Sequence, residues 1–251
     1  MRFPVVAIVF VLVCAVAQVV RAGITVSSFD TYAQANAYAP LNKSSYFTTD
    51  DNQNVSPATC DVSEDWTGTN VGGTDTTWHM LATAHAASTT TVTPNAFSMT
   101  GAGSFSYDIT TTATFSEPLQ HASLYIPGAV SSVGSVFVID TPSNYTLSVR
   151  LNRLGGVYFA SFAEGGVILN QSNFSSIPKI VSISGTIAPG QYQIGVTAKD
   201  GGPTGLPDGV NHIIRDGSFG DFAFSLQLPE PTVTAISALF VVMAVHRKRK
   251  G

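Results

Sequence analysis

The stretch YTLSVRLN, from Tyr145 to Asn152, alternates apolar and polar residues along its whole length. Successive side chains of an extended strand point to opposite faces, so this period of two predicts a strand with one buried face. The same alternation recurs in YQIGVTAK at 192–199 and in FAFSLQL at 222–228. Alternation, in place of continuous apolar runs, argues against a parallel sheet buried on both faces.

Turn residues punctuate the apolar runs. Gly155-Gly156 and Gly165-Gly166 suit tight hairpins because glycine reaches positive φ without penalty, and Pro189-Gly190 turns the chain again. About nine or ten short strands without an internal repeat predict an all-β fold, an antiparallel β-sandwich or jelly roll. Within this body, at 23–228, residues 30–73 are polar and weakly periodic. They predict either a set of long loops or an edge decoration.

The N-terminus has the layout of an export signal. Met1-Arg2 supplies a positive start, Val5–Val20 is apolar except for Gln18, and Val20-Arg21-Ala22 places small or modest residues before Gly23. This order is typical of a secretory signal peptide, so residues 1–22 are expected to be removed as the chain is exported. A retained N-terminal anchor is the alternative.

Charge and cysteine content limit the function of the exported body. Between Gly23 and Pro231 there are 6 basic and 16 acidic residues, which gives a net charge of −10. Such a surface has no phosphate-neutralising patch, so no nucleic-acid partner is expected. Cys60 is the one cysteine left after Cys14 leaves with the leader, so no intramolecular disulfide can form. We expect Cys60 to be a small buried side chain and not a reactive thiol.

The C-terminal residues 229–251 fall into three parts. Pro229-Glu230-Pro231 comes first, the uncharged apolar run 232–245 follows, and a basic tail occupies 246–251. The two prolines fix φ and remove two amide donors, which keeps this tripeptide extended and accessible to a processing enzyme. The apolar run is about 21 Å long as a helix, against a hydrocarbon core of about 30 Å. The tail compensates because its cations can reach the headgroups and stop transfer; they are Arg247, Lys248, Arg249 and Lys250.

This arrangement resembles the PEP-CTERM sorting signal of bacterial surface proteins. The resemblance covers about a tenth of the chain and implies an exosortase as processing partner. It also implies transient retention in the inner membrane, processing near Pro-Glu-Pro, and delivery to the cell envelope or the extracellular matrix, often beside exopolysaccharide. We therefore expect an exported, non-enzymatic protein of the cell surface or matrix.

Two other functions stay open. A carbohydrate-binding β-sandwich module could use Trp66 and Trp78 as platforms on which sugar rings stack. A secreted hydrolase is the weaker alternative, because nothing in the sequence places Glu117 beside Glu164 as a carboxylate pair.

Metal binding has little support in the sequence. Asp50, Asn52 and Asn54 offer oxygens at alternate positions like the start of a calcium loop, but Val55 stands where that loop needs glycine. His79 and His85 share one face of an expected strand, and a bare pair does not make a metal site. No cofactor is expected, with calcium at the Asp50 segment as the alternative.

Overall fold

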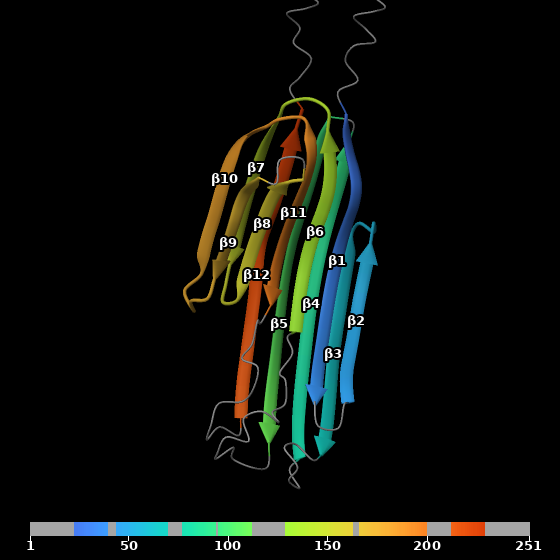
Figure 1. Ribbon diagram of the computed structural model, residues 1–251, viewed down its shortest axis with the longest axis vertical. Helices are drawn as coiled ribbons and strands as arrows, with labels where there is room; N and C mark the ends of the chain where they lie inside the picture. Colours follow the sequence, from blue (N-terminus) through green and yellow to red (C-terminus); the bar gives the residue numbers. More distant parts are fainter. Residues whose placement is uncertain are drawn as a thin grey trace, which may run out of the picture.

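The computed structural model describes residues 23–39, 44–69, 77–93, 95–111, 129–162, 166–199 and 212–228. Twelve β-strands account for nearly all of these residues (Figure 1). They are β1 Ile24–Ala39, β2 Ser44–Gln53, β3 Ala58–Thr69, β4 Thr77–Thr93, β5 Ala96–Thr111, β6 Ala129–Ile139, β7 Ser143–Leu151, β8 Gly155–Ser161, β9 Val167–Asn173, β10 Lys179–Ile187, β11 Gly190–Lys199 and β12 His212–Gln227.

The strands form two six-stranded sheets that face one another. Sheet I has the order β2-β1-β6-β11-β8-β9, and sheet II has the order β10-β7-β12-β5-β4-β3. Every neighbouring pair is antiparallel. The prediction of an all-β antiparallel sandwich is confirmed at this level, with more strands than the expected nine or ten.

Over the described part of 30–73 the prediction of long loops is wrong, and the alternative of an edge decoration fits better. Strands β1, β2 and β3 cover most of that range, and β2 and β3 are the edge strands of sheets I and II. In β3 the buried side chains are as small as Ala58 and Cys60, while the residues between them are polar and exposed. A strand of this composition alternates buried and exposed residues, but its small buried side chains give little contrast in hydrophobicity. Its sequence therefore resembles that of a loop.

Aromatic rings fill one end of the core. At this end of the sandwich β1 begins and β12 ends (Figure 1). Phe137 of β6 lies 5.3 Å from Phe97 and 5.6 Å from Phe224, centroid to centroid, so its ring contacts two rings of the opposite sheet. Phe159 of β8 extends the cluster, 5.5 Å from Phe224. The alternation read at 145–152 is confirmed, because its four apolar residues are all buried: Tyr145, Leu147, Val149 and Leu151.

Small side chains fill the core where β1 and β6 lie over β3 and β4. Ala33, Ala35, Ala82 and Ala84 are buried there, which lets the two sheets come close. Three of the hydrogen bonds that cross between the two sheets lie in this region. They are Thr31 Oγ1 with Ser88 Oγ at 2.6 Å, Ser131 Oγ to the His85 carbonyl at 2.6 Å, and Cys60 Sγ to the Thr31 carbonyl at 2.8 Å.

Cys60 is buried, as expected from the sequence. Burial raises the pKa of its thiol, and the hydrogen bond from Asn52 acts in the opposite direction with a smaller effect. A buried thiol that donates to a carbonyl and resists ionisation is a packing residue, because the nucleophilic form is the thiolate.

Both ends of the described body are held at one end of the sandwich (Figure 1). The N–H of Gly23 donates to Asp140 Oδ1 at 2.8 Å, and β1 begins at the next residue. Leu228 is buried, and its N–H donates to the Asn95 carbonyl at 3.0 Å just beyond β12.

Candidate functional site

The outer face of sheet I carries a hollow of about 400 Å³. Its described lining residues all lie in strands, namely β1, β6, β8, β9 and β11. Ligand sites in proteins usually measure about 300–1,000 Å³, so a small ligand or part of a polymer can fit.

The hollow arises from the register of the strands. Gly134 of β6 lies directly opposite Gly195 of β11, and the same cross-strand row continues to Asp30 on one side and Tyr158 on the other. Residues directly opposite in antiparallel strands share a face, so this row puts two glycines between two large side chains. The two glycines place no side chain of their own on the floor. In the next row, Gly156 lies opposite Thr197 and widens the floor toward β8.

Asp30 and Tyr158 form the two sides of the hollow. Three inter-strand steps separate them, which is about 14 Å between their Cα atoms. The Tyr158 side chain is 38% exposed. A Cβ added to Gly134 would lie 3.0 Å from Asp30 Oδ1, so the Asp30 carboxylate lies over the Gly134 backbone. The carboxylate therefore contributes to the floor as well as to the side.

The β1 side of the hollow disfavours added negative charge. Burial raises the pKa of Asp30, and the nearby Asp51 carboxylate raises it further, against a smaller lowering by the backbone N–H of Asp30 itself. Burial and then Asp51 also raise the pKa of Tyr32, which lies directly opposite Asp51 on the neighbouring strand. Lys199 brings a positive charge to the lining.

The remaining lining groups suit hydrogen bonding to a polyhydroxylated ligand. Asn170 and Gln193 have amide groups, and Ser132 and Thr197 have hydroxyls. Each of these side chains both donates and accepts hydrogen bonds. Among the described residues of the lining, Asp30 is the one carboxylate, whereas glycoside hydrolysis generally uses two.

The two tryptophans expected to stack on sugars are not part of this hollow. Trp66 lies in β3, opposite the buried Met80, and its half-buried side chain packs against the core. Trp78 lies in β4, and its side chain is outside the described residues. Both strands belong to sheet II, so sugar binding by Trp66 and Trp78 stays a prediction without support from the hollow.

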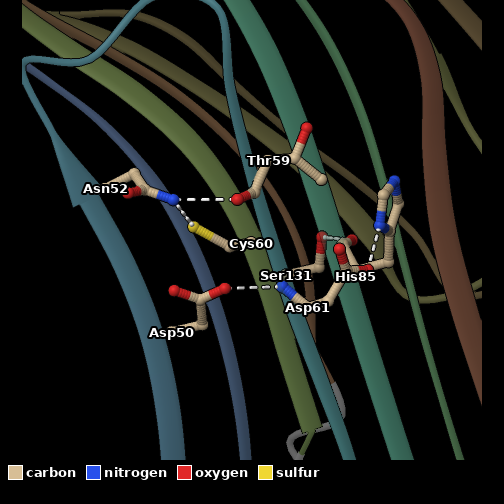
Figure 2. Close-up of polar contacts among 7 residues, drawn as sticks. All are labelled: Asp50, Asn52, Thr59, Cys60, Asp61, His85 and Ser131. Carbon is tan, nitrogen blue, oxygen red and sulfur yellow. Dashed lines mark hydrogen bonds and ion pairs between the residues drawn. The ribbon is translucent and has the colours of Figure 1, made fainter.

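The three residues of the calcium-like segment make contacts with neighbouring strands, and Figure 2 shows those of Asp50 and Asn52. Asp50 Oδ2 accepts from the Asp61 N–H at 2.8 Å, and Asn52 Nδ2 donates to the Thr59 carbonyl at 2.8 Å. Asn54, beyond the end of β2, accepts at Oδ1 from the Phe29 N–H at 3.1 Å. The first two contacts hold the edge of sheet I against the edge of sheet II.

Calcium binding at this segment therefore stays a prediction, and the structure gives its side chains a different role. Over the described ranges of the chain, no group of three or more His, Cys, Asp and Glu side chains is placed to hold a metal ion.

The histidines of sheet II are each paired with an aspartate. His79 Nε2 lies 2.5 Å from Asp65 Oδ1, His85 Nδ1 lies 2.6 Å from Asp61 Oδ1, and His212 Nε2 lies 2.7 Å from Asp108 Oδ1. His79 and His85 are both exposed on β4, in accordance with the expected shared face. Sequence reasoning missed their partners because each partner belongs to another strand.

Several sequence-predicted residues fall outside the described part of the chain. They are the signal peptide at 1–22, the candidate acids Glu117 and Glu164, the tripeptide Pro229, Glu230 and Pro231, and the basic residues Arg247, Lys248, Arg249 and Lys250. In the part that is described, no helix has the length and apolar character needed to cross a membrane.

Comparison with known proteins gives no family. No protein-family model and no curated protein matches the chain. Among solved structures, an α-xylosidase of glycoside hydrolase family 31 from Xanthomonas citri aligns with 73% of this chain and 30% of its own, at 9% identity and a TM-score of 0.21. The structure of infectious bursal disease virus Gx strain aligns with 83% of this chain and 75% of its own, at 8% identity and a TM-score of 0.16. The chain thus spans under a third of the xylosidase, and neither score defines a shared fold.

Proposed function

We propose that this chain is an exported, non-enzymatic protein of the bacterial cell surface or extracellular matrix, sorted by its C-terminal PEP-CTERM signal. The proposal has four parts: a signal helix at 1–22, a sandwich of jelly-roll form at 23–228, a membrane helix at 232–245 and a basic stop at 246–251. Its partners are an exosortase, the inner membrane during sorting, and exopolysaccharide at the final location.

The main observation in support is the position of Leu228, the residue directly before Pro-Glu-Pro. Leu228 is buried and its N–H is bonded to the Asn95 carbonyl, and the next residue, Pro229, has no N–H with which to continue such pairing. Leu228, a residue of the core, thus stands directly before Pro-Glu-Pro. A cut within that tripeptide would leave every described strand of the sandwich in place.

The start of the body supports the proposal in the same way. The first strand begins at Ile24, one residue after Gly23, where cleavage by signal peptidase is expected. Cleavage would turn the Gly23 nitrogen, now 2.8 Å from Asp140 Oδ1, into a charged α-ammonium group. The cut would therefore add an ion pair and leave every described strand in place.

Fractionation of a bacterial host that encodes an exosortase tests this proposal. The intact chain is expected in the envelope or matrix fraction. A chain that lacks 229–251 has no sorting signal and is expected to be released. A chain with Arg247, Lys248, Arg249 and Lys250 all changed to Ser separates the role of the cations from that of the tripeptide. Identical distribution of the three chains would overturn the proposal.

Carbohydrate binding is a second proposed function, and the hollow on sheet I favours it. An open, glycine-floored trough beside Tyr158 suits a sugar better than the half-buried Trp66 does. A glycan array probed with the full chain tests it. Loss of binding with Tyr158→Ala supports the hollow, and loss with Trp66→Ala alone supports the tryptophan.

A further inference from the structure

We propose that the hollow on sheet I binds a neutral polysaccharide that runs along β6 and β11, with Tyr158 stacked on a sugar ring and Asp30 accepting hydrogen bonds from its hydroxyls. This inference rests on the second proposed function, since it names the residues and the ligand class of that site. It is independent of the sorting signal.

The shape of the hollow suits a polymer. Its floor follows Ser132 to Val136 on β6 and Gln193 to Lys199 on the antiparallel neighbour β11. Five residues of strand extend over about 14 Å. The described lining residues all belong to strands, so the proposed polymer would follow the strand direction along the sheet surface.

The floor allows a ring to approach the backbone. Gly134 and Gly195 lie side by side, so no side chain rises between Asp30 and Tyr158 in this row. A Cβ added to Gly195 would meet its nearest neighbour, the Val133 carbonyl oxygen, at 3.8 Å. A side chain thus fits at this position, and the strand itself gains nothing from glycine here. Glycine inside a strand often marks a place where another molecule approaches closely.

The side chains match the two surfaces of a sugar. The exposed part of the Tyr158 ring offers an apolar face, and sugar rings present C–H groups to such faces. The Asp30 carboxylate accepts hydrogen bonds, while Asn170 and Gln193 both donate and accept them, as sugar hydroxyls do. A purely apolar ligand would leave these polar groups without partners.

Charge selects a neutral polymer over an anionic one. Burial and the Asp51 carboxylate already disfavour the ionised form of Asp30. A uronate or sulfate placed beside Asp30 would be disfavoured for the same two reasons, loss of water and repulsion by a neighbouring carboxylate. Lys199 offsets only part of this cost, and residues 23–231 together carry a net charge of −10. Long-range repulsion would also slow the approach of an anionic chain.

Affinity electrophoresis of the full chain in mild detergent tests the inference. Native gels contain hydroxyethylcellulose or laminarin as neutral probes, or alginate as the anionic probe. We expect retardation in a neutral gel and none in alginate. Tyr158→Ala is expected to weaken binding about fivefold or more, the size of a lost stacking contact. Gly195→Val is expected to abolish binding because its side chain rises from the floor into the hollow.

Two control variants match these changes outside the hollow. Phe174→Ala removes an aromatic ring that is 79% exposed beyond β9, and Gly220→Val fills an open position in β12. Both are expected to bind like the unchanged chain. Circular dichroism and Tm establish that each variant is folded. Because valine suits a strand and Gly195 has room for a Cβ, Gly195→Val keeps the test valid even if Tyr158→Ala fails to fold.

The inference is overturned if neither neutral probe retards the chain, if alginate retards it more strongly, or if both hollow variants bind as the unchanged chain does. Fractionation of the same variants separates the two proposals. Normal sorting of Tyr158→Ala and Gly195→Val with lost binding supports both. Binding by a chain that is not sorted contradicts the sorting proposal alone.

Discussion

Gly23 and Asp140 meet at the start of the sandwich, where the Gly23 N–H donates to Asp140 Oδ1 at 2.8 Å across 117 positions of sequence. Asp140 follows β6, the neighbour of β1 in sheet I, so the contact fixes the first residue of the body to the adjacent strand. The proposed cleavage after Ala22 would make this contact an ion pair between an ammonium group and a carboxylate.

Asp140→Asn should therefore destabilise the cleaved protein more than the uncleaved one. An exposed ion pair contributes less than about 1 kcal/mol, so we expect a loss of that size in the cleaved form and a smaller loss in the uncleaved form. Urea denaturation of both forms measures the difference. Equal losses would show that the Gly23 nitrogen carries no charge that Asp140 senses.

Asp30→Asn should raise stability at neutral pH. Burial raises the pKa of Asp30 above its ordinary 3.8, so the folded state binds the proton more tightly than the unfolded state. The free energy of unfolding then falls as pH rises from 3.8 to the raised value. Asparagine removes this cost, and the gain should be below about 1 kcal/mol because the carboxyl group is partly exposed.

The gain from Asp30→Asn should shrink at about pH 3, where the carboxyl group is protonated in both states. Urea denaturation at the two pH values measures it. A variant less stable than the unchanged chain at neutral pH would show that the Asp30 carboxylate stabilises the fold. A gain in stability on Asp30→Asn would mean that the carboxylate costs stability, which is expected of a residue that serves ligand binding.

Phe137→Ala should be severely destabilising. The ring is fully buried and contacts aromatic rings of both sheets, so its removal leaves a cavity that costs about 3–5 kcal/mol. Phe174→Ala, at a position 79% exposed, should change stability by less than about 0.5 kcal/mol. Thermal unfolding compares the two variants. Similar Tm values would contradict the placement of Phe137 in the core and of Phe174 on the surface.

Gly103→Ala and Gly195→Ala should have opposite effects. A Cβ at Gly103 would lie 1.9 Å from Ser131 Oγ and 2.6 Å from a Phe219 ring carbon, so overpacking should cost about 1–3 kcal/mol. A Cβ at Gly195 has room, and alanine should add about 0.4–1 kcal/mol by restricting the unfolded chain. Chemical denaturation measures both. A destabilised Gly195→Ala would contradict the open floor.

The fold could be predicted where large apolar residues mark the buried face. Residues 145–151 alternate Tyr, Leu, Val and Leu with polar residues, and the structure buries those four. The range 30–73 lacks that contrast because most of its described buried side chains are small, such as those of Ala33, Ala35 and Cys60. Composition alone then could not separate an edge strand from a loop.

The hollow could not be predicted because it depends on register. Gly134 and Gly195 lie in different strands, and only the pairing of β6 with β11 brings them side by side. The His–Asp pairs of sheet II depend on pairing in the same way, with His212 and Asp108 separated by 104 positions. The sequence signal that was present is a glycine inside each alternating strand, at 134 and 195.

The intact mass of the protein extracted from the envelope of an exosortase-encoding host tests the central claim most directly. The account predicts a mass that lacks residues 1–22 and the segment after Pro-Glu-Pro, including Arg247 to Lys250. A mature mass that still contains Arg247 to Lys250 would contradict it.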